Sequence, residues 1–188
     1  MGRRFARVAL AMAFIVVCFN GVFAQPYRQL TTADFQGVPK PRMYGNIAYT
    51  NCTINFHYDP QRYGRDDYRL NATVTLTMNR ERSWLDNRNI LNRKMLDEIL
   101  NHEQGHYIIA YMEQQELLRQ INRTRFSANY AREAQAMFNR IDAKYKQLND
   151  NYEADTRHMQ DRVQQRSWDV YFKKRLAYMP PVDAEGDY

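Results

Sequence analysis

The chain has 188 residues, of which 44% are hydrophobic, which is enough for the core of one globular domain and argues against a second full domain. Its formal charge of +6 at pH 7 would by itself suit a nucleic-acid-binding protein. Residues 1–24 contain three arginines and no acidic residue, so the rest of the chain carries +3, and its basic residues are interspersed with acidic ones. We therefore expect a surface of mixed charge and no nucleic-acid partner.

Residues 1–24 have the features of a signal peptide. Three arginines precede an apolar run from Val8 to Phe19, and a small residue, Ala24, marks the cleavage site. A membrane-spanning helix needs roughly 20 apolar residues, so this run is too short for an anchor. We predict cleavage near Ala24, export to the periplasm or the extracellular medium, and no stable membrane insertion afterwards.

Residues 25–42 are rich in polar residues and turn formers, which predicts an extended lead-in. In residues 48–58 and 70–78, apolar side chains then occupy every second position and polar ones lie between them. This alternation predicts two strands of a small antiparallel sheet with one buried face. The stretch from Asp59 to Asp67 is predicted to be the loop between them.

Helical periodicity follows. Between Ile90 and Leu118 apolar residues recur at spacings of three and four without a proline, which predicts a long helix. A second helix is predicted to begin with Ser127 as its N-cap and to break at residues 149–151. A third is predicted from Tyr152 to Tyr178, where two prolines follow.

These elements place the chain in the α+β class, with a small antiparallel sheet followed by three long helices. The single domain is predicted to cover residues 43–179, and the acidic tail 180–188 is predicted to be disordered.

Residues 102–106 read His-Glu-Gln-Gly-His inside the first predicted helix. Two histidines four apart project from one helix face, so both imidazoles can reach one cation about 2.0–2.1 Å away. Glu103 is rotated by about 100° from His102, which points it beside that cation, where a general base for an activated water belongs. The pattern predicts Zn²⁺ held by His102 and His106, with Glu103 as the catalytic base. The alternatives are solvated or core histidines, or a structural metal site.

A catalytic zinc site usually has three protein ligands, and the third must come from elsewhere in the chain. We expect His158, because Asp155 lies three residues earlier on a predicted helix and could orient its imidazole. Tyr152 is a candidate hydrogen-bond donor to the oxyanion that forms during hydrolysis. The other candidates for the third ligand are His57, Glu133, Glu153 and Asp155.

These residues resemble a bacterial family described as predicted secreted zinc-dependent proteases, over residues 30–170. The family commonly has a glycine after the late histidine, where this chain has Met159. The resemblance implies a zincin-like domain that binds zinc through three histidines. The matching segments are Asp34–Pro39, Ser83-Trp84, Leu100–Tyr107, Tyr152-x-x-Asp155-Thr156-x-His158 and Gln165-x-x-Trp168.

The predicted function is hydrolysis of peptide bonds in a peptide or protein substrate by a zinc-dependent enzyme. Two alternatives remain at the level of sequence. One is a metal-stabilised binding module of the cell envelope without catalysis, and the other is a hydrolase of non-peptide amides such as cell-wall cross-links. The sequence indicates no oligomeric state, and iron or cobalt could replace zinc at such a site.

Overall fold

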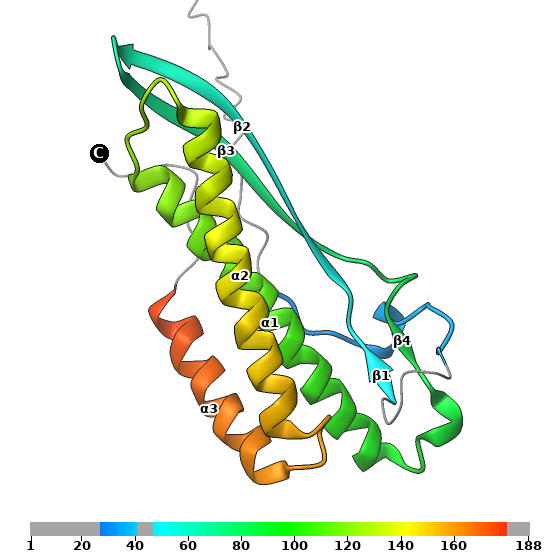
Figure 1. Ribbon diagram of the computed structural model, residues 1–188. Coiled ribbons are helices and arrows are strands. Elements are labelled where there is room, and N and C mark those ends of the chain that lie inside the picture. Colours follow the sequence, from blue (N-terminus) through cyan, green and yellow to red (C-terminus); the bar gives the residue numbers. More distant parts are fainter. Residues whose placement is uncertain (1–26, 41–46, 180–188) are drawn as a thin grey trace, which may run out of the picture.

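The computed structural model describes residues 27–40 and 47–179 (Figure 1). The predicted signal peptide, its cleavage site and the tail 180–188 lie outside the described residues. The described part is a mixture of strands and helices, which confirms the predicted α+β class. In chain order its elements are η1 (Thr32–Asp34), β1 (Ala48–Tyr49), β2 (Cys52–Gly64), β3 (Asp67–Met78), β4 (Trp84–Leu85), η2 (Asn87–Asn89), α1 (Arg93–Arg123), α2 (Tyr130–Thr156) and α3 (Arg162–Tyr178).

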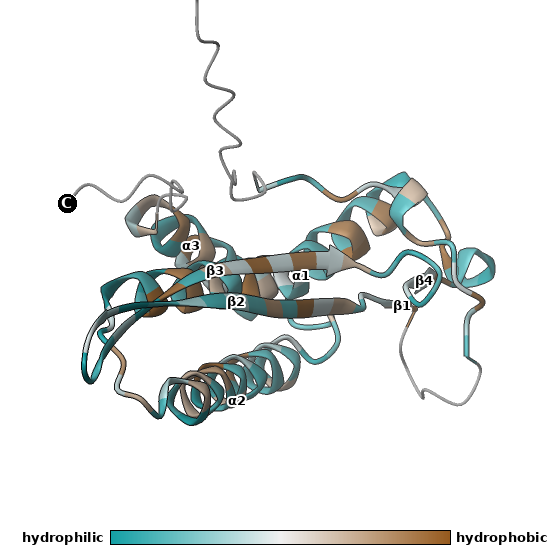
Figure 2. Ribbon diagram, turned by 90° about the horizontal axis from the view of Figure 1, so that it is seen from above, coloured by the Kyte–Doolittle hydropathy of each residue, from teal (hydrophilic) through white to brown (hydrophobic). Residues whose placement is uncertain are grey.

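Strands β2 and β3 form one long antiparallel hairpin, in which Cys52 lies opposite Met78 and Pro60 lies opposite Leu70. The alternation predicted from the sequence is confirmed, because Leu70, Val74 and Leu76 are buried; bands of apolar and polar residues alternate along both strands in Figure 2. The single strand predicted for residues 48–58 is wrong in one respect, because the structure divides it into two strands. Ala48 and Tyr49 form β1, which pairs with β4 in a separate two-stranded sheet, and only the part from Cys52 onward belongs to the hairpin.

The predicted loop from Asp59 to Asp67 is wrong, because most of it continues the hairpin. Backbone pairing extends to Gly64 on β2 and begins at Asp67 on β3. Tyr68 also exchanges two backbone hydrogen bonds with Phe126, which follows α1. The tip of the hairpin therefore lies beside the connection between α1 and α2 (Figure 1).

Helix α1 is the centre of the fold, since it packs against the hairpin and against both other helices. It begins after Asn92, whose side chain accepts a hydrogen bond from the backbone N–H of Met95. Its most buried apolar residues, Met112 and Leu117, are not exposed at all. Among the described helices, none is both long enough and apolar enough to span a membrane.

Helix α2 begins and ends later than the sequence predicts. Its N-cap is Asn129 and not Ser127, because the Ser127 hydroxyl and backbone N–H both bond to the carboxylate of Glu133. The predicted break at residues 149–151 is wrong as well. Asn149 bonds to a histidine of α1, and Asn151 accepts from Gln147 one turn earlier, so neither side chain competes with the helix backbone.

The break falls at residues 157–159 instead. Arg157, His158 and Met159 have φ angles of 48°, 53° and 69°, which is a left-handed run that side chains other than glycine adopt at a cost. Helix α3 then begins after Asp161, whose carboxylate accepts hydrogen bonds from the next helix turn. Residues 152–156 consequently belong to α2, not to α3 as predicted.

Hydrogen bonds join the described part of the lead-in, residues 27–40, to the rest of the domain. Leu30 is 3% exposed, and its backbone N–H donates to Oε1 of Gln104 on α1 at 2.7 Å. Gly37 donates to the backbone oxygen of Ser83 at 2.8 Å. A Cβ atom on Gly37 would lie 2.7 Å from the backbone oxygen of Glu81, so this close approach requires glycine.

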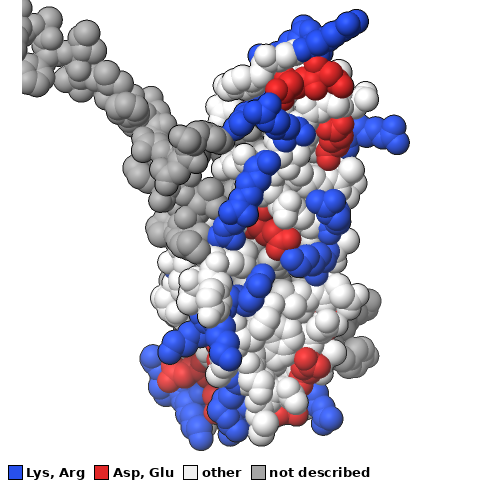
Figure 3. All heavy atoms as spheres, turned by 90° about the vertical axis from the view of Figure 1, so that its left-hand side faces the viewer, with Lys and Arg blue, Asp and Glu red and all other residues white. Residues whose placement is uncertain are grey.

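Charged side chains of both signs are spread over the face in Figure 3. Lys and Arg side chains run along its whole length, with Asp and Glu side chains between them. This face therefore carries mixed charge.

Candidate metal centre

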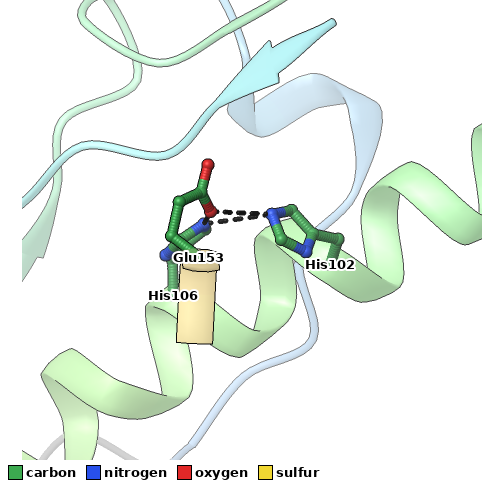
Figure 4. Close-up of side chains that lie close together, drawn as sticks. All are labelled: His102, His106 and Glu153. Atoms are coloured by element: carbon green, nitrogen blue, oxygen red, sulfur yellow. Dashed lines mark hydrogen bonds and ion pairs between the residues drawn. The ribbon is translucent and has the colours of Figure 1, made fainter. Parts of the chain in front are cut away.

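Two imidazoles from α1 and one carboxylate from α2 converge on a point between the helices (Figure 4). Oε2 of Glu153 lies 3.2 Å from Nε2 of His102 and 3.2 Å from Nε2 of His106. The two Nε2 atoms are 3.3 Å apart. Four ligands at about 2.0–2.1 Å from a tetrahedral zinc ion are separated from one another by about 3.3 Å. The three atoms therefore have the spacing of one face of a zinc coordination tetrahedron.

Both imidazoles are held in the orientation that a metal ligand needs. Nδ1 of His102 lies 3.1 Å from Oε1 of Gln165, and Nδ1 of His106 lies 2.7 Å from Oδ1 of Asn149. The amide nitrogen of Gln165 donates to Asp169, so its oxygen faces the imidazole. Donation from Nδ1–H leaves the Nε2 lone pair of each ring free for a cation.

The electrostatics of the three groups favour a positive charge between them. Burial raises the pKa of Glu153, but hydrogen bonds to His102 and His106 outweigh it and hold that pKa far below its usual range. Burial lowers the pKa of His106, but its bond to Glu153 and the charges of Glu103 and Glu153 raise it overall. Two lone pairs and a carboxylate at such distances attract each other only through a proton or a metal cation. The donor set therefore fits a divalent metal.

Glu103 lies beside this point with an unused oxygen. Its side chain is 3% exposed, and Oε2 is buried without a hydrogen-bond partner among the described residues. Glu103 lines a cavity of about 340 Å³ together with the three converging residues. Buried carboxylate oxygens are nearly always paired in folded proteins, so an unpaired one at a cavity indicates a site for water or ligand.

Gly105 and Tyr152 explain how α2 comes so close to α1. The Tyr152 hydroxyl donates to the backbone oxygen of His102 at 2.9 Å, and its ring stacks on the His102 imidazole at 4.9 Å between centroids. A Cβ atom on Gly105 would overlap that hydroxyl and lie 2.5 Å from Cζ of the ring. The glycine inside the motif thus makes room for the tyrosine that precedes Glu153.

Tyr152 does not face the cavity. It is completely buried, and its hydroxyl is also bonded to Gln165. The predicted oxyanion donor therefore lies beneath the metal centre, where it supports the first histidine.

His158 lies near the site, but the third ligand atom beside the two histidines of α1 comes from Glu153 and not from His158. Its Nδ1 forms a hydrogen bond with Oε1 of Glu153, the oxygen that points away from the two other histidines, and its side chain is 44% exposed. Asp155 accepts a hydrogen bond from the Trp168 indole and none from His158. His158 does line the same cavity as Glu103.

Of the residues predicted for the site, the structure thus brings together His102, Glu103 and His106 with Glu153, which the sequence offered as an alternative third ligand in place of His158. His57 lies on the polar face of β2 opposite Thr73, and Glu133 is bonded to Ser127 at the start of α2. The left-handed φ of Met159 suits the glycine that the resembling family commonly has at this position.

Sequence reasoning did not single out Gln165 or Asn149, which orient the two imidazoles. Gln165 lies in the Gln-x-x-Trp segment that matches the resembling family, and this match is the sequence signal that could have identified it. Asn149 has no local signal, because an asparagine in a polar helix segment is common and only the packing of α2 on α1 brings it to His106.

Comparison with known proteins matches the chain to a family of bacterial proteins. No curated protein matches the chain. No solved structure matches it either. Residues 26–159, more than half of the chain, match the profile of a family described as bacterial protein of unknown function, and this span contains the four residues of the candidate centre but not α3. The chain therefore belongs to this bacterial family, DUF922.

Proposed function

We propose that this protein is a zinc-dependent peptidase in which His102, His106 and Glu153 hold the metal and Glu103 is the general base. The observation that carries the proposal is the triangle of ligand atoms, 3.2–3.3 Å on each edge, beside a buried carboxylate with a free oxygen. Two histidines and one glutamate form a ligand set of known catalytic zinc sites, which keep the fourth position open. The His-Glu-x-x-His pattern and the resemblance to predicted secreted zinc proteases support the same function.

A zinc ion at this point would supply Lewis acidity, lowering the pKa of a coordinated water toward 7 and polarising the carbonyl of the bond to be cut. Glu103 would take a proton from the attacking water at Oε2 and deliver it to the leaving amine. Gln165 and Asn149 keep the two imidazoles in the metal-binding tautomer.

His158 has a positioning role in this proposal. By bonding to Oε1 of Glu153, it leaves Oε2 directed at the two histidines. The sequence predicts instead that His158 is the third ligand, and the two assignments differ in which substitution should weaken zinc binding more. If Glu153 is the ligand, Glu153→Gln should weaken zinc binding far more than His158→Gln does, and the reverse order would restore His158 as the ligand.

The decisive variant is Glu103→Gln, which removes the base and keeps the shape of the side chain. We expect it to bind one zinc ion like the wild type and to cleave peptides about 10²–10⁴-fold more slowly. His102→Gln should lose both zinc and activity. A zinc-loaded wild type that cuts no peptide in a broad library, or a Glu103→Gln variant with full activity, would contradict the proposal.

Export is part of the proposal and has its own test. If residues 1–24 are a signal peptide, the protein recovered from the producing bacterium should lie outside the cytoplasm and begin at Gln25. An intact N-terminus in the cytoplasmic fraction would contradict export without affecting the metal centre.

A further inference from the structure

A second cavity, of about 480 Å³, adjoins the metal centre. It lies between the beginning of β2 and the facing sides of α1 and α2. Tyr49, Thr50, His106 and Asn149 line both cavities, so the second begins where the metal centre ends.

Glu113 lies in the wall of this second cavity and has no partner. Its residue is 9% exposed, and it forms no hydrogen bond or ion pair with any other described residue. Burial, together with the charge of Asp142 and against that of Lys146, raises the pKa of Glu113 to about 7. The carboxyl group meets no hydrogen-bond donor among the described residues, and its partial burial disfavours the charged form. Its placement is what a site for a cationic group would need.

The remaining charges of the cavity are mainly acidic. Asp142 and Asp150 of α2 also line it. Lys146 is the one lysine or arginine in the described wall, and it is paired with Asp142 at 2.8 Å while its side chain is 73% exposed. No basic side chain of the described wall forms an ion pair with Glu113 or Asp150, and Lys146 acts on Glu113 only from a distance.

The wall between His106 and Glu113 is apolar. Ile109 and Ala110 of α1 face Ile54 of β2 and Phe138 of α2 across the cavity. The aliphatic stem of a lysine or arginine side chain packs well against such a surface while its charged end reaches an acidic group.

We propose that this cavity binds a lysine or arginine side chain of the substrate, with Glu113 receiving its positive charge. The inference rests on the proposed peptidase function, since it makes the cavity a specificity subsite of that enzyme. Glu113 follows His106 by seven residues on α1, which places it about 10 Å further along the same helix face. An extended peptide advances about 3.3–3.6 Å per residue, so the basic residue lies within three residues of the bond that is cut.

The first test is cleavage-site profiling of zinc-loaded protein on a proteome-derived peptide library. The wild type should show lysine or arginine enriched at one fixed position within three residues of the cut. For a peptide that carries lysine there and a copy that carries norleucine, kcat/KM should favour lysine by about 10–100-fold, the range of a charge-assisted hydrogen bond. Glu113→Gln should abolish that ratio. Asp97→Asn, which changes a 55% exposed carboxylate on α1 outside the cavity, should preserve it.

The second test does not depend on hydrolysis. Binding of n-butylguanidinium to zinc-loaded Glu103→Gln protein is followed by NMR shifts of the residues that line the second cavity. Saturable binding that is lost with the additional change Glu113→Gln supports the subsite, even if no peptide is cleaved and the peptidase proposal fails. Cleavage without basic preference, a preference that survives in Glu113→Gln, or the absence of n-butylguanidinium binding would overturn the subsite and leave the metal centre standing.

Discussion

Replacing Gly105 with alanine should destabilise the protein, although the same change in an ordinary helix stabilises it. In an exposed helix interior, alanine is favoured over glycine by about 1 kcal/mol. At position 105 the new Cβ would overlap the Tyr152 hydroxyl, and Tyr152 is completely buried, so its ring cannot move into solvent. Moving the ring would disturb the hydrogen bonds of its hydroxyl to His102 and Gln165.

The costs outweigh the gain in helix propensity. Overpacking of a buried contact costs about 1–3 kcal/mol. Two hydrogen bonds contribute about 1 kcal/mol each. After subtracting the propensity term, we expect Gly105→Ala to lower the free energy of unfolding by about 2–4 kcal/mol. Zinc affinity should fall as well, because Glu153 follows Tyr152 directly and moves with it.

The assay is denaturant unfolding of the metal-free protein, monitored by circular dichroism. Tyr152→Leu serves as the second background, since leucine keeps an apolar side chain but lacks the hydroxyl and Cζ. In the Tyr152→Leu background, Gly105→Ala should leave the free energy of unfolding unchanged or raise it. The difference between the two backgrounds then measures the contact between residue 105 and the Tyr152 side chain. If Gly105→Ala stabilises the wild type by about 1 kcal/mol, or has the same effect in both backgrounds, then the explanation of the motif glycine is wrong.

Three further predictions concern the groups around the site. Gln165→Ala should weaken zinc binding by about 10–100-fold in competition with a chromophoric chelator, because His102 loses the partner of its Nδ1; unchanged affinity would remove Gln165 from the site. Stripping zinc with a chelator should lower the free energy of unfolding of the wild type, by about 2.7 kcal/mol relative to protein at free zinc 100 times the dissociation constant, and should not affect His102→Gln. Glu113 has a pKa of about 7 in the folded protein, above its usual value, so the folded state binds the extra proton and stability falls as pH rises from about 4.5 to 7. Glu113→Gln should remove up to about 3 kcal/mol of that fall, and parallel pH profiles of the two proteins would contradict the assignment.

The sequence predicts the strands and helices that bury one face and expose the other. Residues 70–78 alternate because one face of β3 packs on α1, and the long helix is periodic because it contacts the hairpin and both other helices. Residues 59–63 are exposed on both faces of the hairpin, so no alternation marks them as strand and they resemble a loop.

The site was predictable where its residues share one helix turn. His102, Glu103 and His106 follow from the geometry of a single helix. Glu153 does not, because its distance from the two histidines depends on how α2 packs against α1, and that contact depends on Gly105 and Tyr152. The break after residue 156 was missed because three left-handed residues without glycine or proline leave no mark in the sequence.

One metal ion should lie among Nε2 of His102, Nε2 of His106 and a carboxylate oxygen of Glu153. A crystal structure of zinc-loaded protein, with anomalous data collected on both sides of the zinc absorption edge, tests it directly. We expect a single strong peak about 2.0–2.2 Å from these three atoms. A peak that has Glu153 outside coordination distance, or no peak between the two histidines at saturating zinc, would contradict it.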